Sequence, residues 1–320
     1  MRTSVQLRDP AARSRPLRRA SSLPDVVVIG GGPAGLSAAL VLARACRSVV
    51  VVDAGRPRNY AAVSMHNYLT RDGVSPKAFL REARAEVRRF GVRVVGGVAA
   101  RARSTDGGFE VRVPGRGAFR CRKLVIGTGV TDELPGLPGF ASFYGRSVHH
   151  CPYCDGWRWR GRCIAAYGPG KHGVGLALAL RGWSDRIVAL THGGRVSTKA
   201  RDVLTHHGVT LREEPVVGLK GRAGLLGQVL LKGGETLHCD ALFFNTGQAQ
   251  KSPLPEQLGC TIDERGGVVV DRRKRTRVPG LYVVGDALSD VQFVVTAAAA
   301  GAQAAVAICR EFQEEEGRSL

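Results

Sequence analysis

The sequence predicts an α/β fold made of two units of parallel strands and helices. The main observation is a pattern that occurs twice, in which a short apolar strand runs through a glycine-rich turn into a helix. The first glycine turn spans residues 30–35 and the second spans residues 168–173. This pattern is the building block of parallel α/β sheets that bind nucleotides. The sequence therefore predicts two Rossmann-like dinucleotide-binding domains, the second inserted into the first.

The segments around the first turn form one strand–turn–helix–strand unit. Residues 25–29 are a β-branched run, residues 36–44 have the apolar spacing of a helix, and residues 48–52 form a second apolar strand. A helix is then expected at 76–90. Further strands are expected at 93–99, 109–113 and 123–126.

The second unit follows a proline- and glycine-rich stretch at residues 134–139, which we interpret as a hinge. A strand at 280–284 then ends in a Gly-Asp turn and leads into an alanine-rich helix at 296–310. Because these last segments resemble the end of a nucleotide-binding unit, they are assigned to the first domain. The predicted first domain is therefore discontinuous, 25–131 and 248–312, and encloses an inserted domain, 132–247.

Composition narrows the classes of partner. The 320 residues carry a net charge of +20, but only eight lysines, so arginine provides nearly all of the positive charge. These arginines are scattered, with no stripe interleaved with aromatic residues, which argues against a nucleic-acid-binding surface. No apolar run reaches the roughly 18 residues of a membrane span. We therefore expect no membrane insertion and a cytoplasmic location.

Residues 1–24 have a different composition from the rest of the chain. Arginines alternate there with small residues and prolines without any apolar period, which predicts a disordered basic tail. Arg18 and Arg19 together resemble a twin-arginine export signal. Cleavage after the apolar run that follows would destroy the first glycine turn, so export is not expected.

The first glycine turn has the residues that a dinucleotide requires. Gly30, Gly32 and Gly35 match G-x-G-x-x-G directly between a strand and a helix. The first glycine allows the tight turn, the second lets backbone approach a pyrophosphate, and the third lets helix and strand pack closely. Asp53 ends the second strand, where a carboxylate accepts hydrogen bonds from ribose hydroxyls. These four residues predict a dinucleotide site.

Cys151 and Cys154 form the only C-x-x-C pair among eight cysteines. At this spacing one thiolate can resolve a mixed disulfide formed at the other, which predicts redox chemistry. His149 and His150 are expected to lower a thiol pKa when protonated, and Asp155 is a candidate proton carrier. The alternative is half of a zinc site, but no second C-x-x-C supplies the remaining ligands. No metal site is predicted.

A second motif indicates which dinucleotide binds. Residues 276–286 run from Thr276 to Gly285-Asp286 and resemble the T-x-x-x-G-(apolar)₃-G-D segment of flavoproteins with two dinucleotide-binding domains. In that group the segment contacts the ribityl and phosphate part of the flavin. Thr128 and Gly129 resemble the A-T-G segment of the same proteins. The resemblance implies FAD as cofactor, with Gly285 and Asp286 among its ligands.

From residue 25 to about 310 the order of motifs resembles that of low-molecular-weight thioredoxin reductases. The resemblance implies that Cys154 faces the flavin, that Cys151 exchanges with the substrate and that Asp155 handles protons. It also implies flavin contacts at Asn67 and Gln292. The expected partner is a thioredoxin-like protein or a small-molecule disulfide or dithiol, and the expected assembly is a homodimer.

The resemblance is weaker at the predicted NADPH site. Gly168, Gly170 and Gly173 keep the glycine spacing, but the arginine pair with which the reductases hold the NADPH 2′-phosphate is missing. Arg195 and Lys199 are the only basic residues in the corresponding segment. NADPH thus stays an open expectation.

Three functions remain open from the sequence. The first is a thioredoxin reductase-type enzyme with NADPH as donor. The second is a dithiol oxidase of the same superfamily, which closes a disulfide in a small-molecule natural product and passes the electrons to oxygen. The third is a non-catalytic flavin-binding redox sensor.

Overall fold

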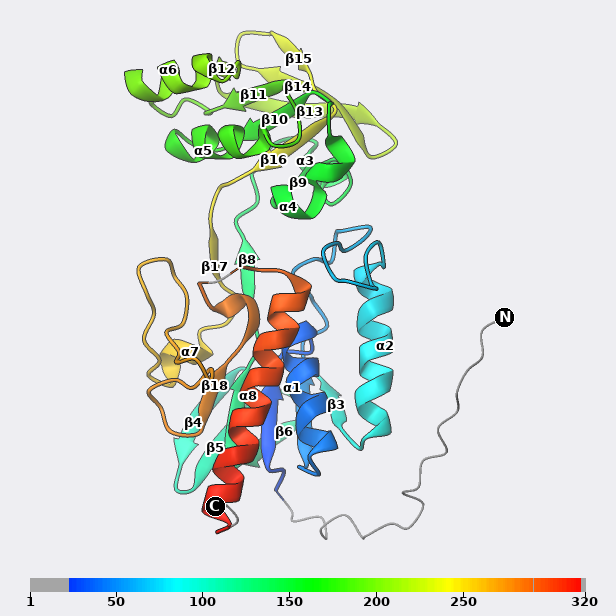
Figure 1. The fold of residues 1–320 in the computed structure, drawn as a ribbon, viewed down its shortest axis with the longest axis vertical. Helices are drawn as coiled ribbons and strands as arrows, with labels where there is room; N and C mark the ends of the chain where they lie inside the picture. The colour runs from blue at the N-terminus through cyan, green and yellow to red at the C-terminus, as the bar shows by residue number, and fades with distance from the viewer. Residues whose placement is uncertain (1–22, 290, 318–320) are drawn as a thin grey trace, which may run out of the picture.

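The structure, a computed structural model, describes residues 23–289 and 291–317. The predicted basic tail lies almost entirely outside the described residues. Two α/β units are joined by a pair of extended segments, with the chain passing from the lower unit to the upper one and back (Figure 1). None of the helices among the described residues is long and apolar enough to cross a membrane.

The lower unit is built on a five-stranded parallel sheet. One face carries three helices, α1 (Pro33–Arg44), α2 (Pro76–Arg89) and α8 (Val294–Glu315). The other face packs against an antiparallel meander, β4 (Arg101–Thr105), β5 (Gly108–Val113) and β6 (Gly117–Cys121). The sheet strands, in spatial order, are β18 (Leu281–Val283), β7 (Lys123–Ile126), β1 (Val26–Ile29), β2 (Val49–Asp53) and β3 (Arg93–Gly96).

The upper unit repeats this plan between β7 and β18, which confirms the predicted insertion of one Rossmann-like unit into another. Helices α5 (Lys171–Leu180) and α6 (Thr198–His206) cover one face of its parallel sheet. The other face packs against the antiparallel strands β13 (Val216–Arg222), β14 (Leu225–Leu231) and β15 (Thr236–His238), and against the short helix α3 (Phe140–Phe143). The sheet strands, in spatial order, are β12 (Thr210–Arg212), β11 (Ile187–Leu190), β10 (Ile164–Tyr167), β16 (Ala241–Phe244) and β9 (Val148–His149).

Two antiparallel strands connect the units, β8 (Val130–Asp132) and β17 (Gln248–Gln250). The crossing therefore lies just before the proline- and glycine-rich stretch that we interpreted as a hinge. That stretch instead packs against the upper unit, because Leu137 is buried there beside Phe140. The exact domain limits stay a prediction.

Two elements differ in length from the sequence prediction. β3 is shorter than the predicted 93–99 strand, because Gly97 adopts a φ of +156°, outside the range of an ordinary strand. Helix α8 is longer than predicted, since Phe312 is fully buried and extends its apolar face by a further turn. The remaining short elements are α4 (Pro152–Asp155), α7 (Leu254–Gln257), η1 (Gly156–Trp159) and η2 (Gly285–Ala287).

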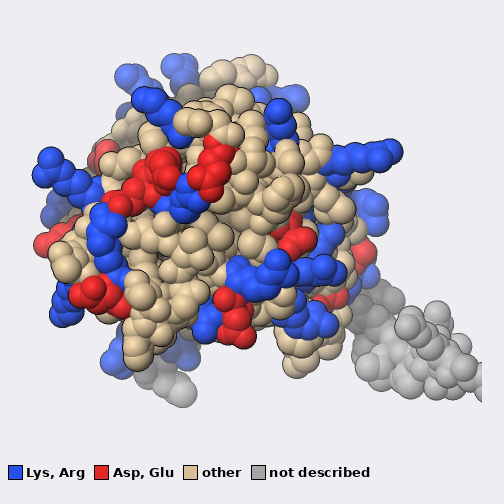
Figure 2. Space-filling model, turned by 90° about the horizontal axis from the view of Figure 1, so that it is seen from above, with Lys and Arg blue, Asp and Glu red and all other residues tan. Residues whose placement is uncertain are grey.

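Basic side chains are dispersed over the face of the upper unit, with acidic side chains among them (Figure 2). Many arginines of the chain are paired, as Arg212 is with Glu214 and Glu235. This distribution agrees with the interpretation of the positive charge as scattered.

Candidate active site

A cavity of about 560 Å³ lies between the two units, within the range of protein sites that hold small molecules and cofactors. The lower unit supplies most of its wall, and the upper unit supplies His150, Cys154 and Asp155. Predicted site residues in the lining are Gly30, Gly32, Asp53, Thr128, Gly129, Cys154, Asp155, Gly285, Asp286 and Gln292.

The first glycine turn combines close packing with an open approach. A Cβ at Gly35 would lie 1.9 Å from the carbonyl oxygen of Gly30, so helix α1 can pack against the end of β1 only without a side chain there. A Cβ at Gly32 would meet nothing within 4 Å and would project into free space. Gly32 also precedes α1 directly, where unpaired backbone N–H groups favour an anion. The turn therefore has the form of a pyrophosphate cradle.

Asp53 lies at the end of β2 beside this turn and lines the cavity. Its Oδ2 accepts a hydrogen bond of 2.7 Å from Arg84 of α2, and its Oδ1 accepts one of 3.1 Å from the Gly55 N–H. Arg84 also lines the cavity, and no motif in the sequence singled it out. The guanidinium orients the carboxylate and adds positive charge to the cavity wall.

The Gly285-Asp286 turn and the residues that follow β7 form the adjoining part of the wall. A Cβ at Gly285 would lie 2.8 Å from the Ala34 Cβ, so this turn lies against the start of α1. Among the described residues, the Thr128 hydroxyl oxygen is one of a few buried polar side-chain atoms without a hydrogen-bond partner. Because burying an unpaired hydroxyl costs free energy, this atom favours a polar ligand in the cavity. The residues present thus fit an FAD molecule along both parts of this wall.

Arg58 is a site residue that sequence reasoning missed. Its guanidinium pairs with the carboxylates of Asp132 (2.5 Å) and Asp286 (3.0 Å) and donates a hydrogen bond of 2.6 Å to Gln292. Burial alone would lower the pKa of Arg58, but hydrogen bonds to Asp132 and the charges of both carboxylates raise it.. Arg58 therefore stays charged and holds the Gly-Asp turn against the strand that leads to the upper unit. A single arginine within a loop has no sequence signature for this role.

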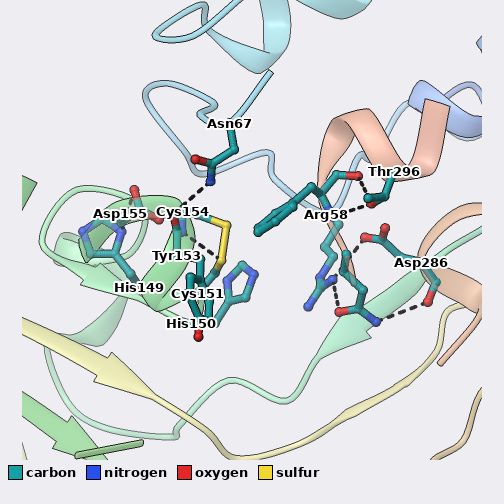
Figure 3. Close-up of a disulfide and its surroundings, with 12 residues drawn as sticks. Arg58, Asn67, His149, His150, Cys151, Tyr153, Cys154, Asp155, Asp286 and Thr296 are labelled. Atoms are coloured by element: carbon teal, nitrogen blue, oxygen red, sulfur yellow. Dashed lines mark hydrogen bonds and ion pairs between the residues drawn. A yellow bond between two sulfur atoms is a disulfide. The ribbon is translucent and has the colours of Figure 1, made fainter. Parts of the chain in front are cut away.

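The C-x-x-C pair is joined as a disulfide, and Cys154 lies on the cavity wall. Figure 3 shows the disulfide next to His150 and Asp155, with Arg58 and Asp286 on the other side of the view. Cys151 is the N-cap of α4, and its sulfur accepts a hydrogen bond of 3.1 Å from the Cys154 N–H. Such a bond favours the thiolate when the pair is reduced. The two sulfurs therefore have different surroundings.

His149 is buried and contacts both Trp159 and Asp155. Its Nε2 accepts a hydrogen bond of 3.1 Å from the Trp159 indole, so the neutral ring carries its proton on Nδ1. That Nδ1 lies 3.3 Å from a carboxylate oxygen of Asp155. His149 thus orients Asp155 rather than a thiol.

His150 lines the cavity beside Cys154. Burial lowers the pKa of its imidazole in spite of the nearby carboxylate of Asp132. The ring is therefore neutral at pH 7 and does not supply the positive charge that we expected to act on the thiols.

The other predicted site residues lie outside the cavity lining. Asn67 donates from its side-chain nitrogen to the backbone carbonyl of Tyr153 (2.9 Å), so it bridges the lower unit to the dithiol helix instead of lining the wall.

Gly168, Gly170 and Gly173 form the turn after β10 in the upper unit. A Cβ at Gly173 would lie 2.4 Å from the Gly168 carbonyl oxygen, the same close packing that Gly35 shows in the first turn. Among the described residues, no cluster of three or more potential metal ligands is present.

Comparison with known proteins agrees with this geometry. The family model described as pyridine nucleotide-disulphide oxidoreductase matches residues 24–301. A probable thioredoxin reductase of Arthroderma benhamiae is 31% identical over 330 residues, covering 92% of this chain and 82% of the relative. Thioredoxin reductase aclD of Aspergillus oryzae is 28% identical, covering 93% of this chain and 99% of the relative.

Solved structures agree as well. The crystal structure of HlmI has a TM-score of 0.87 and 35% identity, covering 92% of this chain and 94% of that one. A putative thioredoxin reductase TrxB from Bacillus anthracis has a TM-score of 0.87 and 28% identity, covering 92% of this chain and 99% of that one. The chain therefore belongs to the pyridine nucleotide-disulphide oxidoreductase family and is an FAD-dependent disulfide oxidoreductase.

Proposed function

We propose that this enzyme exchanges two electrons between bound FAD and an external disulfide or dithiol through Cys151 and Cys154. The observation that carries the proposal is that Cys154 lines the same cavity as the first glycine turn and the Gly-Asp turn. When bound, FAD would supply the hydride and electron chemistry that connects the dithiol to a nicotinamide or to oxygen. Gly30, Gly32 and Asp53 would hold its dinucleotide part.

The surroundings of the two sulfurs support a division of roles. Cys154 is on the cavity side, whereas Cys151 is absent from the lining and has a sulfur that accepts a backbone N–H. We assign Cys151 as the thiol that exchanges with the substrate and Cys154 as the thiol that communicates with the flavin. In the reductive direction the Cys151 thiolate attacks a substrate disulfide, one substrate thiol leaves, and Cys154 then displaces the other as the pair closes.

Asp155 is the proposed proton carrier of this exchange. It lies on the cavity wall directly after Cys154, and His149 holds it by a contact of 3.3 Å. A carboxylate in this place can take the proton of the attacking thiol and, once protonated, give it to the departing thiolate. The chain of contacts from Trp159 through His149 fixes its orientation.

The substrate would approach from the exposed side of the dithiol helix. Tyr153 lies between the two cysteines and Trp157 follows them, and these side chains are 68% and 70% exposed, which is unusual for large aromatic residues. Such a surface suits either candidate partner, a thioredoxin-like protein or a small-molecule disulfide or dithiol. A homodimer in the cytoplasm stays part of the proposal.

NADPH is the first candidate for the other redox partner. The upper unit has the required glycine turn at residues 168–173, and Arg195 and Lys199, in the segment after β11, are exposed. In this function the enzyme is a reductase of the thioredoxin reductase type.

A second candidate is a dithiol oxidase with oxygen as electron acceptor. It is favoured by the segment after β11, whose backbone lies against the second glycine turn. A Cβ at Gly194 would lie 2.3 Å from the backbone nitrogen of Gly170, and one at Gly170 would lie 3.2 Å from the carbonyl oxygen of Arg195. At Gly32, the equivalent glycine of the first turn, a Cβ would meet nothing within 4 Å. A nucleotide could use the second turn only if this segment moved.

Flavin absorbance distinguishes the two candidates. Under anaerobic conditions NADPH should bleach the flavin band of a reductase. An oxidase should resist NADPH and NADH, but should be bleached by an excess of a small dithiol and should release peroxide when air is admitted. A flavin that neither donor bleaches would contradict both enzymes and favour the non-catalytic sensor.

Serine variants test the proposed dithiol route. Cys154→Ser should abolish bleaching by the dithiol while FAD stays bound, and Cys151→Ser should leave a thiolate that forms a charge-transfer band with oxidised flavin. Cys46→Ser, which changes an exposed free cysteine, is the matched control and should behave as the parent. If the two active-site variants behave oppositely, the assigned roles are reversed; if both are bleached like the parent, the dithiol route is wrong.

A further inference from the structure

A second pair of thiols lies away from the cavity. Cys163 directly precedes β10, and Cys239 lies between β15 and β16. Their sulfur atoms are 3.7 Å apart, although 76 residues separate them in the chain. The exchange proposed for Cys151 and Cys154 makes no use of either residue.

The fold itself brings these cysteines together. Strands β10 and β16 are parallel neighbours in register from Ile164 and Ala241 onward. Just before that register begins, the Cys163 N–H donates to the side chain of Asp240 (2.9 Å) and the Cys163 carbonyl accepts from the Asp240 N–H (2.8 Å). The backbone is therefore fixed on both sides of the pair. A disulfide requires an S–S distance of about 2.05 Å, so the sulfurs must approach by only about 1.7 Å.

The two thiols have complementary surroundings. Cys163 is partly exposed, whereas Cys239 is buried. The hydrogen bond with Cys239, together with the charge of Arg186, lowers the pKa of the Cys163 thiol to about 7, and the same hydrogen bond raises that of Cys239. A reagent from solvent can therefore react with the Cys163 thiolate, and the buried Cys239 thiol lies close enough to react with the product.

Other free cysteines lack this combination. Burial raises the pKa of the Cys121 thiol to about 12 and also raises the pKa values of Cys260 and Cys309. A thiol that stays protonated is a poor nucleophile. These residues therefore serve as internal comparisons for the pair.

We propose that Cys163 and Cys239 form a second redox-active dithiol, which a hydroperoxide closes to a disulfide. The Cys163 thiolate attacks the peroxide oxygen and becomes a sulfenic acid, while the other oxygen leaves as water after protonation. The Cys239 thiol then attacks the sulfenic sulfur, forms the disulfide and releases a second water. Two thiols and one hydrogen peroxide thus give one disulfide and two waters. Closure ties the start of β10 to the turn before β16.

The test uses the full-length protein with the active-site pair removed, Cys151→Ser/Cys154→Ser, so that it does not depend on the proposed function. After treatment with hydrogen peroxide, intact mass should fall by two hydrogen atoms and return on reduction. Peptide mapping without reductant should find the segment with Cys163 joined to the segment with Cys239. Adding Cys163→Ser should prevent closure, whereas adding Cys121→Ser should leave it unchanged.

Two further measurements keep the inference testable if a variant folds poorly. Adding Cys239→Ser should leave a sulfenic acid at Cys163 that dimedone traps. In the otherwise unaltered chain, alkylation of Cys163 by iodoacetamide should rise with pH around 7, about two pH units below an ordinary thiol. A peroxide-treated protein without the cross-link, or a Cys163 no more reactive than Cys121, would overturn the proposal.

Discussion

Two glycines of the first turn allow the fold and the cofactor to be tested separately. Gly32→Ala and Gly35→Ala each add one methyl group, three residues apart in the same turn. The added Cβ of Gly32→Ala meets no protein atom within 4 Å and extends from the wall into the cavity. The added Cβ of Gly35→Ala lies 1.9 Å from a backbone oxygen.

The expected magnitudes follow from these distances. An ordinary contact begins near 3.4 Å, so Gly35→Ala requires helix α1 and the end of β1 to separate by about 1.5 Å. Overpacking of this kind costs about 1–3 kcal/mol, and the better helix propensity of alanine offsets up to about 1 kcal/mol. Gly32 has φ −83° and ψ −175°, which alanine adopts freely, so the FAD-free fold should change by less than about 0.5 kcal/mol. Its methyl group instead occupies space for a pyrophosphate, and a steric cost of about 1–3 kcal/mol weakens binding by roughly 5- to 150-fold.

The assay has two parts, equilibrium denaturation of the FAD-free protein and titration of the refolded protein with FAD by flavin fluorescence. Gly32→Ala should match the parent in the first part and bind FAD more weakly in the second. Gly35→Ala should be impaired in both. If Gly32→Ala binds FAD as tightly as the parent, the first turn is not the pyrophosphate cradle.

Further predictions concern packing, the arginine network and acid stability. Gly301→Ala in α8 should lower stability and weaken FAD binding, because its Cβ would lie 2.0 Å from a backbone oxygen of α1. Gly175→Ala in α5, whose Cβ would meet nothing within 4 Å, should raise stability by up to about 1 kcal/mol without affecting FAD binding. Equal effects of the two variants on thermal unfolding would refute this prediction. Arg58→Met should leave two carboxylates unpaired and weaken FAD binding about tenfold or more, while Arg103→Met, at a surface pair, should not; flavin titration of both decides. Burial alone would raise the pKa of Glu311, but a hydrogen bond from Lys123 helps lower it below its ordinary value of 4.5. This carboxylate therefore stabilises the fold above about pH 4.5 and loses that effect as pH falls through its folded pKa. Denaturation midpoints of Glu311→Gln should fall less between pH 6 and 3 than those of the parent.

Local sequence was sufficient to predict the elements that depend on neighbouring residues. The strand, glycine turn and helix of each unit were found because φ and close packing at Gly30, Gly35 and Gly173 admit only glycine. The C-x-x-C pair was found because its chemistry depends on a spacing of three residues. Antiparallel parts such as the β13–β15 sheet were not predicted, since their short apolar runs do not show which strand they pair with.

Contacts between distant segments were decided only by the tertiary structure. Arg58 reaches carboxylates 74 and 228 residues away, and Arg84 of α2 reaches Asp53 at the end of β2. The close approach of Gly194 to Gly170 and the contact of Cys163 with Cys239 are of the same kind.

The sequence by itself therefore determined the class of fold and the disulfide-forming cysteine pair, because each depends on residues within one turn or one strand. The resemblance of its motifs to a known family implied FAD. The tertiary structure decided how the carboxylates are neutralised, which sulfur lies on the cavity wall and which turn is covered. The physical reason is that apolar period and turn chemistry determine which face of an element is buried. They do not determine which distant side chain meets that face, because that depends on the packing of the whole chain.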